Sequence, residues 1–271
     1  MDEARMTEDP KTVALGVIES SGDAFHTNVL QRFRALGWYS LVSPYYMDAT
    51  TNKPREIDLV VESARNYPQR YNRPYGSINT RLYVECKYVP EDQQIVFWFD
   101  NQDLISTDLL LTSTLPFRNR NVIMNQHHYK SSEPRVAKLF RSNRGQRDSR
   151  IESELMYKAL NQCLHAKIYH HLHETIVRDA NFRPENILET AEYPVIVLNS
   201  FEGLWRVDVE DQSNPVPIED HFKLEVNYAY VDDRGNRRND YFLIDVVDFR
   251  TMETYLELFG RDSDAIAEML S

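Results

Sequence analysis

The stretch RLYVECKYV, residues 81–89, places two opposite charges inside an apolar segment with the composition of a buried strand. Leu82 and Val84 are typical core residues, whereas Glu85 and Lys87 are charged. Alternate side chains of a strand share a face, so Glu85 and Lys87 are expected to point to the same side of a sheet. Burying an ion costs several kcal/mol unless the ion is paired or holds a metal. The segment therefore predicts a strand whose charged pair has a role beyond packing.

The periodicity on either side of this segment predicts the order of the elements. A helix and two strands precede it, and a long helix and a further strand follow it. The expected ranges are 22–38 for the first helix, 39–46 and 55–63 for the two strands, 151–179 for the long helix and 193–200 for the last strand. Residues 204–211 are expected to pair beside that last strand, and residues 64–80, rich in proline and asparagine, are expected to form a loop.

This order predicts a single α/β domain over residues 1–271, in which a central mixed sheet is flanked by helices. The expected core comprises about residues 16–89 and 151–210, interrupted by an insertion over 90–150. The insertion contains one strand-like piece, residues 94–99. A C-terminal addition over 211–271 has the pattern of a β-hairpin, 221–233 with 239–249, followed by one or two helices in 252–270.

Composition favours a cytoplasmic protein. The 271 residues contain two cysteines, which indicates neither a disulfide framework nor a cysteine zinc site. No apolar run approaches the roughly 18 to 20 residues that span a bilayer. The polar N-terminal residues are not those of a secretory signal.

Basic residues are clustered although the net charge is −11. Nine of them lie between Leu115 and Arg150, against two acidic residues, and a second basic run lies between Ser63 and Val84. Such clusters suit a local phosphate-binding face, but solvated surface loops have the same pattern. The candidate nucleic-acid-binding residues are Arg70, Arg73, Arg118, Arg120, Arg141, Arg144 and Arg147. His127 and His128 lie in the first cluster and are expected at the surface or beside phosphates.

A helix that ends in Gly37 and an aromatic residue, followed by strands carrying "ID" at 57–58 and "ECK" at 85–87, resembles the PD-(D/E)XK nuclease superfamily. The resemblance covers roughly residues 16–200 and implies a restriction-endonuclease-like fold. It implies that Asp58, Glu85 and Lys87 form a catalytic centre that hydrolyses phosphodiester bonds. The structural alternative is a Glu85–Lys87 pair on an edge strand, with Asp58 bonded to a backbone turn.

The resemblance also implies a metal and its ligands. Mg²⁺, with Mn²⁺ able to substitute, is a hard cation that prefers carboxylate oxygens and water. Asp58, Glu85 and the backbone carbonyl of Cys86 would bind it, while Lys87 would hold the attacking water or a phosphate oxygen. Gln162, on the long helix, would reach the scissile phosphate or that water. The alternative for Gln162 is an amide satisfied within the core.

One residue departs from the pattern of the superfamily. Relatives often carry a glutamate on the first helix, where this chain has His26. Imidazole is an accepted metal ligand, so His26 is a candidate ligand, and a neutral interior histidine is the alternative. The substitution leaves open whether one or two metals bind.

Three functions are compatible with these residues. The first is a metal-dependent nuclease, an endonuclease rather than an exonuclease, that cuts DNA in defence or repair. The second is a weakened nuclease fold that binds nucleic acid or serves as an assembly module, which His26 and the overall acidity favour. The third is a structural protein that uses its C-terminal hairpin and helices as an oligomer contact. A homodimer or an activating partner is compatible with the first two.

Overall fold

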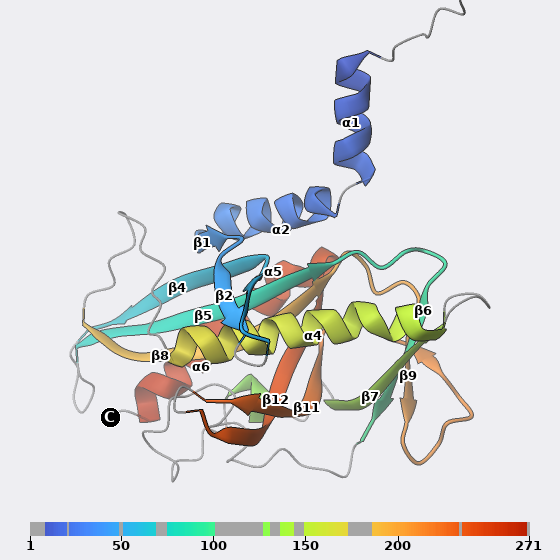
Figure 1. Ribbon diagram of the computed structural model, residues 1–271. Coiled ribbons are helices and arrows are strands. Elements are labelled where there is room, and N and C mark those ends of the chain that lie inside the picture. Colours follow the sequence, from blue (N-terminus) through green and yellow to red (C-terminus); the bar gives the residue numbers. More distant parts are fainter. Residues whose placement is uncertain are drawn as a thin grey trace, which may run out of the picture.

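The computed structural model describes residues 9–20, 22–48, 51–68, 75–100, 127–130, 136–143, 149–172, 186–232 and 235–269. They form an α/β structure with one large mixed sheet flanked by helices (Figure 1). In order across the sheet, its strands are β1 (Tyr39–Val42), β4 (Leu59–Tyr67), β5 (Gly76–Lys87), β8 (Ile187–Leu198), β12 (Arg237–Asp248), β11 (Phe222–Val231), β7 (Val136–Asn143), β6 (Gln94–Phe99), β9 (Leu204–Asp208) and β10 (Val216–Pro217). A separate hairpin consists of β2 (Tyr45–Asp48) and β3 (Lys53–Glu56).

Helices cover both faces of the sheet. The described helices are α1 (Pro10–Ser20), α2 (Asp23–Ala35), α4 (Ser149–Leu172), α5 (Met252–Leu256) and α6 (Leu258–Met269), with short 3₁₀ turns η1 (His128–Lys130) and η2 (Phe249–Thr251). Figure 1 shows α4 in front of the sheet, α5 and α6 behind it, and α1 leading away from the rest.

Strand β5 divides its side chains between two cores. Leu82 and Val84 pack in one core with Phe25, Val29 and other residues of α2 and α6. Tyr83, on the opposite face, packs in a second core with residues of α4 and the β2–β3 hairpin. Glu85 and Lys87 follow Tyr83 at intervals of two residues, so they share the α4 face.

The prediction of the first helix is confirmed, and the strands near it are more broken than expected. Helix α2 forms because Phe25, Val29 and Phe33 recur at helical spacing and are buried. Gly37 ends it in the left-handed region, with φ of +79°. The predicted strand 39–46 is divided into β1 and β2 at Ser43, where φ is +50° and Pro44 follows.

The prediction of a loop over residues 64–80 is wrong for residues 64–67 and 76–80, which belong to strands. Strand β4 continues to Tyr67 and β5 begins at Gly76, and the two remain paired up to these residues. Polar side chains of this segment are buried in β5, among them Ser77, Asn79 and Thr80. Ser77 Oγ donates to Asn66 Oδ1 at 2.6 Å, and just beyond the predicted loop Arg81 donates to two buried glutamates, Glu62 and Glu192. A strand can thus read as polar when its polar groups satisfy one another.

The predicted C-terminal hairpin is confirmed as β11 and β12, and α5 and α6 follow it. It is not an addition at the edge, because β12 pairs in parallel with β8 inside the sheet. Phe242 and Ile244 pack on one face while Leu243 and Val247 pack on the other, so β12 is apolar on both sides. The predicted strand 94–99 is confirmed as β6. Strand β9 pairs with β6 and β10, not with β8 as predicted.

Both cysteines are free, as expected from their spacing. Cys86 and Cys163 are buried in the core, and burial raises the pKa of each thiol well above its ordinary value. Among the described helices, none combines the length and the apolar character needed to cross a membrane.

Candidate functional site

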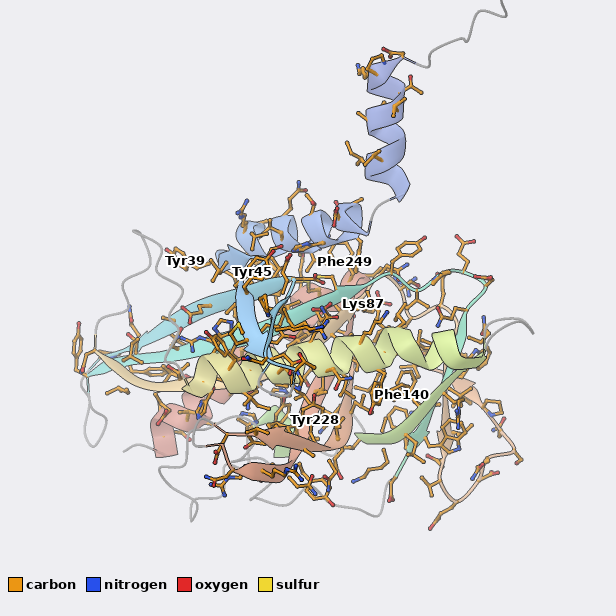
Figure 2. The ribbon with its side chains drawn as sticks, in the orientation of Figure 1. Tyr39, Tyr45, Lys87, Phe140, Tyr228 and Phe249 are labelled. Carbon is orange, nitrogen blue, oxygen red and sulfur yellow. The ribbon has the colours of Figure 1, made fainter. Side chains whose placement is uncertain are left out.

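The charged residues of the predicted motif meet where β4 begins and β5 ends. Leu59, the first residue of β4, lies opposite Val84, so Asp58 lies at the level of Glu85. The Cys86 backbone N–H donates to Asp58 Oδ2 at 2.7 Å, and Lys87 Nζ donates to Glu85 Oε1 (Lys87 is labelled in Figure 2). The structure therefore brings together Asp58, Glu85 and Lys87, which lie up to 29 positions apart in the sequence.

Glu85 is the most strongly perturbed group of this site. Its side chain is 1% exposed, and its Oε2 atom is buried with no hydrogen-bond partner in the part of the chain that the structure describes. Burial, followed by the negative charge of Asp58, raises the pKa of Glu85 to about 8, although Lys87 opposes the shift. Burial lowers the pKa of Lys87, but the charge and hydrogen bond of Glu85, together with the charges of Asp58 and Cys163, outweigh this effect and the net shift is upward. The site is short of positive charge.

The backbone carbonyl of Cys86 faces the same side as Asp58. The N–H and C=O groups of one residue in a strand point to the same neighbour. Because the Cys86 N–H points to Asp58, the carbonyl does so too. Strand β4 begins only at Leu59, opposite Val84, so it provides no ladder partner at this level. The direction of the Cys86 carbonyl suits a metal ligand, and this role stays a prediction.

Gln162 lies on α4, as predicted, and it contacts the segment just before Asp58. Its Nε2 donates to the backbone carbonyl of Glu56 at 3.2 Å, two residues before Asp58. The side chain is half-buried. This hydrogen bond therefore links α4 to the segment that contains Asp58. The contact of Gln162 with a phosphate or a water molecule stays a prediction.

The structure does not bring His26 to these residues. Helix α2 packs on the face of Leu82 and Val84, whereas Glu85 points to the opposite face, toward α4. The His26 Nε2 atom is buried without a hydrogen-bond partner among the described residues. Helix α2 and the Glu85 side chain thus lie on opposite faces of the sheet, and the ligand role of His26 stays a prediction that this packing does not favour.

The predicted nucleic-acid-binding arginines are mostly outside the described residues. Arg141 is exposed on β7, which is separated from β5 by β8, β12 and β11 in the sheet. The others, which lie outside the described residues, are Arg70, Arg73, Arg118, Arg120, Arg144 and Arg147.

The β2–β3 hairpin supplies neighbours of the site that the sequence analysis did not identify. Tyr46 is buried at 2% exposure, and its pKa is raised by burial and then by the charges of Glu85 and Cys163. Arg55 lies directly opposite Tyr46 in the hairpin. No local periodicity could indicate these neighbours, because they depend on how the hairpin folds onto α4.

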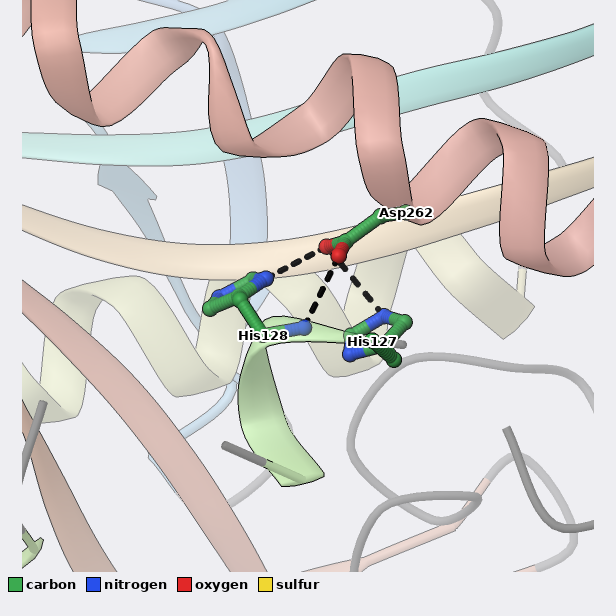
Figure 3. Close-up of side chains that lie close together, drawn as sticks. All are labelled: His127, His128 and Asp262. Atoms are coloured by element: carbon green, nitrogen blue, oxygen red, sulfur yellow. Dashed lines mark hydrogen bonds and ion pairs between the residues drawn. The ribbon is translucent and has the colours of Figure 1, made fainter. Parts of the chain in front are cut away.

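A second polar cluster lies on the other face of the sheet. His127 and His128 were predicted at the surface, but they are buried against Asp262 of α6 (Figure 3). His127 Nε2 lies 3.3 Å from Asp262 Oδ2, and the His128 ring contacts both Asp262 and Asp245. The prediction failed because these acidic partners come from segments more than 100 residues later in the sequence.

The hydrogen bonds of this cluster assign its protons. The three side chains offer ligand atoms within 4.8 Å of one another, which is compatible with a metal. However, the Tyr129 N–H donates to His127 Nδ1, so the His127 proton lies on Nε2, toward Asp262. His128 faces a carboxylate with each ring nitrogen, and despite burial its pKa is raised to about 9. The cluster as arranged is a buried ion pair, and metal binding would require His127 to lose this proton.

The chain matches no protein-family profile, no curated protein and no solved structure.

Proposed function

We propose that this chain is a metal-dependent nuclease that hydrolyses phosphodiester bonds of DNA, as an endonuclease in defence or repair. The observation that carries the proposal is the buried Oε2 of Glu85, which lies beside a second carboxylate, Asp58, and has no hydrogen-bond partner among the residues that the structure describes. A buried, unpartnered carboxylate oxygen is costly unless a cation binds it. Two carboxylates and a backbone carbonyl are hard oxygen ligands, which suit Mg²⁺ or Mn²⁺.

Each residue of the site has a chemical role in this proposal. Asp58, Glu85 and the Cys86 carbonyl would hold the cation. When bound, the metal would lower the pKa of a water molecule and stabilise the charge that develops on the phosphate. Lys87 donates to Glu85 in the metal-free protein, and its remaining N–H groups would orient the attacking water or a phosphate oxygen. The Asp58 carboxylate is already oriented by the backbone N–H of Cys86.

The arrangement of the elements also supports the proposal. Strands β1, β4, β5 and β8 are adjacent in that order, with β5 and β8 parallel and the others antiparallel. Helices α2 and α4 pack on opposite faces of this part of the sheet. Such an arrangement resembles a restriction-endonuclease-like core, with the motif acids at the end of the central strands.

Cleavage of DNA tests the proposal directly. Supercoiled plasmid and labelled single strands are incubated with Mg²⁺, Mn²⁺ or EDTA, and we expect metal-dependent nicking that Asp58→Asn abolishes. Glu56→Asn is the control, because Glu56 is exposed and two residues away. If the folded wild type binds DNA without cutting it under any of these metals, the nuclease proposal fails and the nucleic-acid-binding module takes its place.

Metal affinity should depend on pH. Glu85 must lose its proton to bind a cation, and its pKa is raised to about 8 in the metal-free protein. Affinity for Mn²⁺ should therefore rise about tenfold per pH unit below pH 8 and become constant above it, because one proton leaves for each metal bound. Calorimetric titrations between pH 6 and 9 measure this slope. An affinity that does not vary over this range would show that Glu85 is not a ligand.

A further inference from the structure

The β2–β3 hairpin is fastened to α4 beside the candidate site. The rings of Tyr46 and His165 are in edge contact, with centroids 6.4 Å apart. Asp48 Oδ1 lies 3.6 Å from His165 Nδ1, and the Glu56 carbonyl accepts a hydrogen bond from Gln162. The Tyr46 ring also contacts the ring of Tyr169, with centroids 6.5 Å apart, so several contacts with one helix give the hairpin a defined position.

One face of the hairpin points toward the carboxylates. Tyr46 lies opposite Arg55, and Asp48 lies opposite Lys53. Directly opposed residues of an antiparallel pair share a face. Tyr46 is buried and packs in one core with Tyr83, which lies on the same face of β5 as Glu85, so this face of the hairpin lies toward Glu85. Arg55 and Lys53 therefore add positive charge on the side of the hairpin that faces the site.

The guanidinium of Arg55 is held loosely. Its side chain is 52% exposed, and Arg55 Nε lies 3.7 Å from Asp48 Oδ2, which is longer than a hydrogen bond. The Asp48 carboxylate is engaged elsewhere, since it accepts from Thr51 N at 3.2 Å and Thr51 Oγ1 at 2.7 Å. Arg55 retains donors that face solvent, in the planar fork that matches a phosphate.

We propose that Arg55 binds a backbone phosphate of the nucleic acid next to the one that is cut. This inference rests on the proposed function and identifies a binding residue for it. Arg55 precedes Asp58 by three residues, so their Cα atoms are at most about 10 Å apart. Because the phosphates of one strand follow every ~3.4 Å of helix rise, a strand that reaches Asp58 places another phosphate near Arg55. Arg55 would thereby fix the register of the strand in the site.

The test is DNA binding measured without cleavage. Glu85→Gln is combined with Arg55→Ala, and fluorescence anisotropy with duplex and single-stranded oligonucleotides is recorded in EDTA over a range of salt concentrations. We expect affinity to fall about tenfold and the slope of log affinity against log salt to decrease by roughly 1. Arg55→Lys should retain most of the slope, because the positive charge remains.

Arg32→Ala in the same Glu85→Gln background is the control. Arg32 lies on α2, on the opposite face of the sheet, and pairs with the exposed Glu253 at 2.6 Å. We expect its loss to leave affinity unchanged. The inference is wrong if Arg55→Ala binds with unaltered affinity and salt slope while the wild type cuts DNA. If the wild type neither binds nor cuts, the proposed function fails, and this inference fails with it.

Discussion

Glu85→Gln is expected to abolish metal-dependent cleavage and, in the metal-free protein, to raise the free energy of unfolding. Glutamine keeps the shape of the side chain but cannot offer the cation a charged ligand. Loss of a residue that stabilises charge in a transition state lowers activity by on the order of 10³-fold. Activity and stability should therefore move in opposite directions, which is typical of functional residues that are costly to bury.

The stability change follows from the pKa of Glu85. In the folded protein this pKa is raised from 4.5 to about 8. An acid with a raised pKa takes up a proton on folding between these two values, so stability falls as pH rises from 4.5 to 8. At pH 7 the cost is about 3 kcal/mol, which glutamine avoids. Part of the gain is lost because Lys87 keeps its charge and loses the Glu85 carboxylate as its partner.

Chemical denaturation in EDTA measures this effect. The difference between Glu85→Gln and wild type should be small at pH 5 and largest at pH 8. Glu56→Gln, an exposed neighbour on β3, should change stability by less than about 0.5 kcal/mol at both pH values. A Glu85→Gln protein that is less stable than wild type at pH 8 would mean that the pair with Lys87 compensates fully for burial.

The strands and helices that the sequence predicted best are those with local apolar periodicity. Helix α2, strand β6 and the β11–β12 hairpin are examples. The loop predicted over 64–80 failed because Ser77, Asn79 and Thr80 are polar yet buried in β5, which pairs with β4 on one side and with the distant β8 on the other. Composition measures what each residue prefers alone, whereas burial of these groups depends on long-range partners. The place of β12 inside the sheet is likewise a tertiary property.

The residues of the candidate site also divide into those that local sequence patterns indicate and those whose positions depend on the tertiary structure. Asp58, Glu85 and Lys87 could be found because a period of two puts Glu85 and Lys87 on one face, and the β4–β5 pairing brings Asp58 to their level. The face of the sheet on which His26 lies could not be predicted, because helical periodicity does not say which face of a sheet a helix will cover. Arg55 could not be predicted as a neighbour of the site, because its position depends on the β2–β3 hairpin, which leaves the large sheet at Ser43.

Asp262→Asn is expected to destabilise the protein by about 3–5 kcal/mol at pH 6, because it removes one partner of a buried ion pair. Asp262 is 1% exposed and accepts from the His128 backbone N–H at 2.9 Å and from Tyr193 OH at 3.0 Å, besides its contacts with both histidine rings. The positively charged His128 would remain in the core with Asp245 as its carboxylate partner. Since η1 is anchored to α6 by this pair, the same change should also loosen residues 127–130, and hydrogen exchange can detect it.

The pH dependence separates loss of the ion pair from loss of packing. The folded pKa of His128 is raised from 6.5 to about 9, so the stability that it contributes is complete below pH 6.5 and is lost as pH rises to about 9. The deficit of Asp262→Asn relative to wild type should therefore shrink across this range. Asp264→Asn is the matched control, since Asp264 is 41% exposed on the same helix and its ion pair with Arg65 should contribute no more than about 1 kcal/mol. A deficit that stays constant from pH 6 to 9 would mean that His128 is neutral in the folded protein and that Asp262 acts through its hydrogen bonds alone.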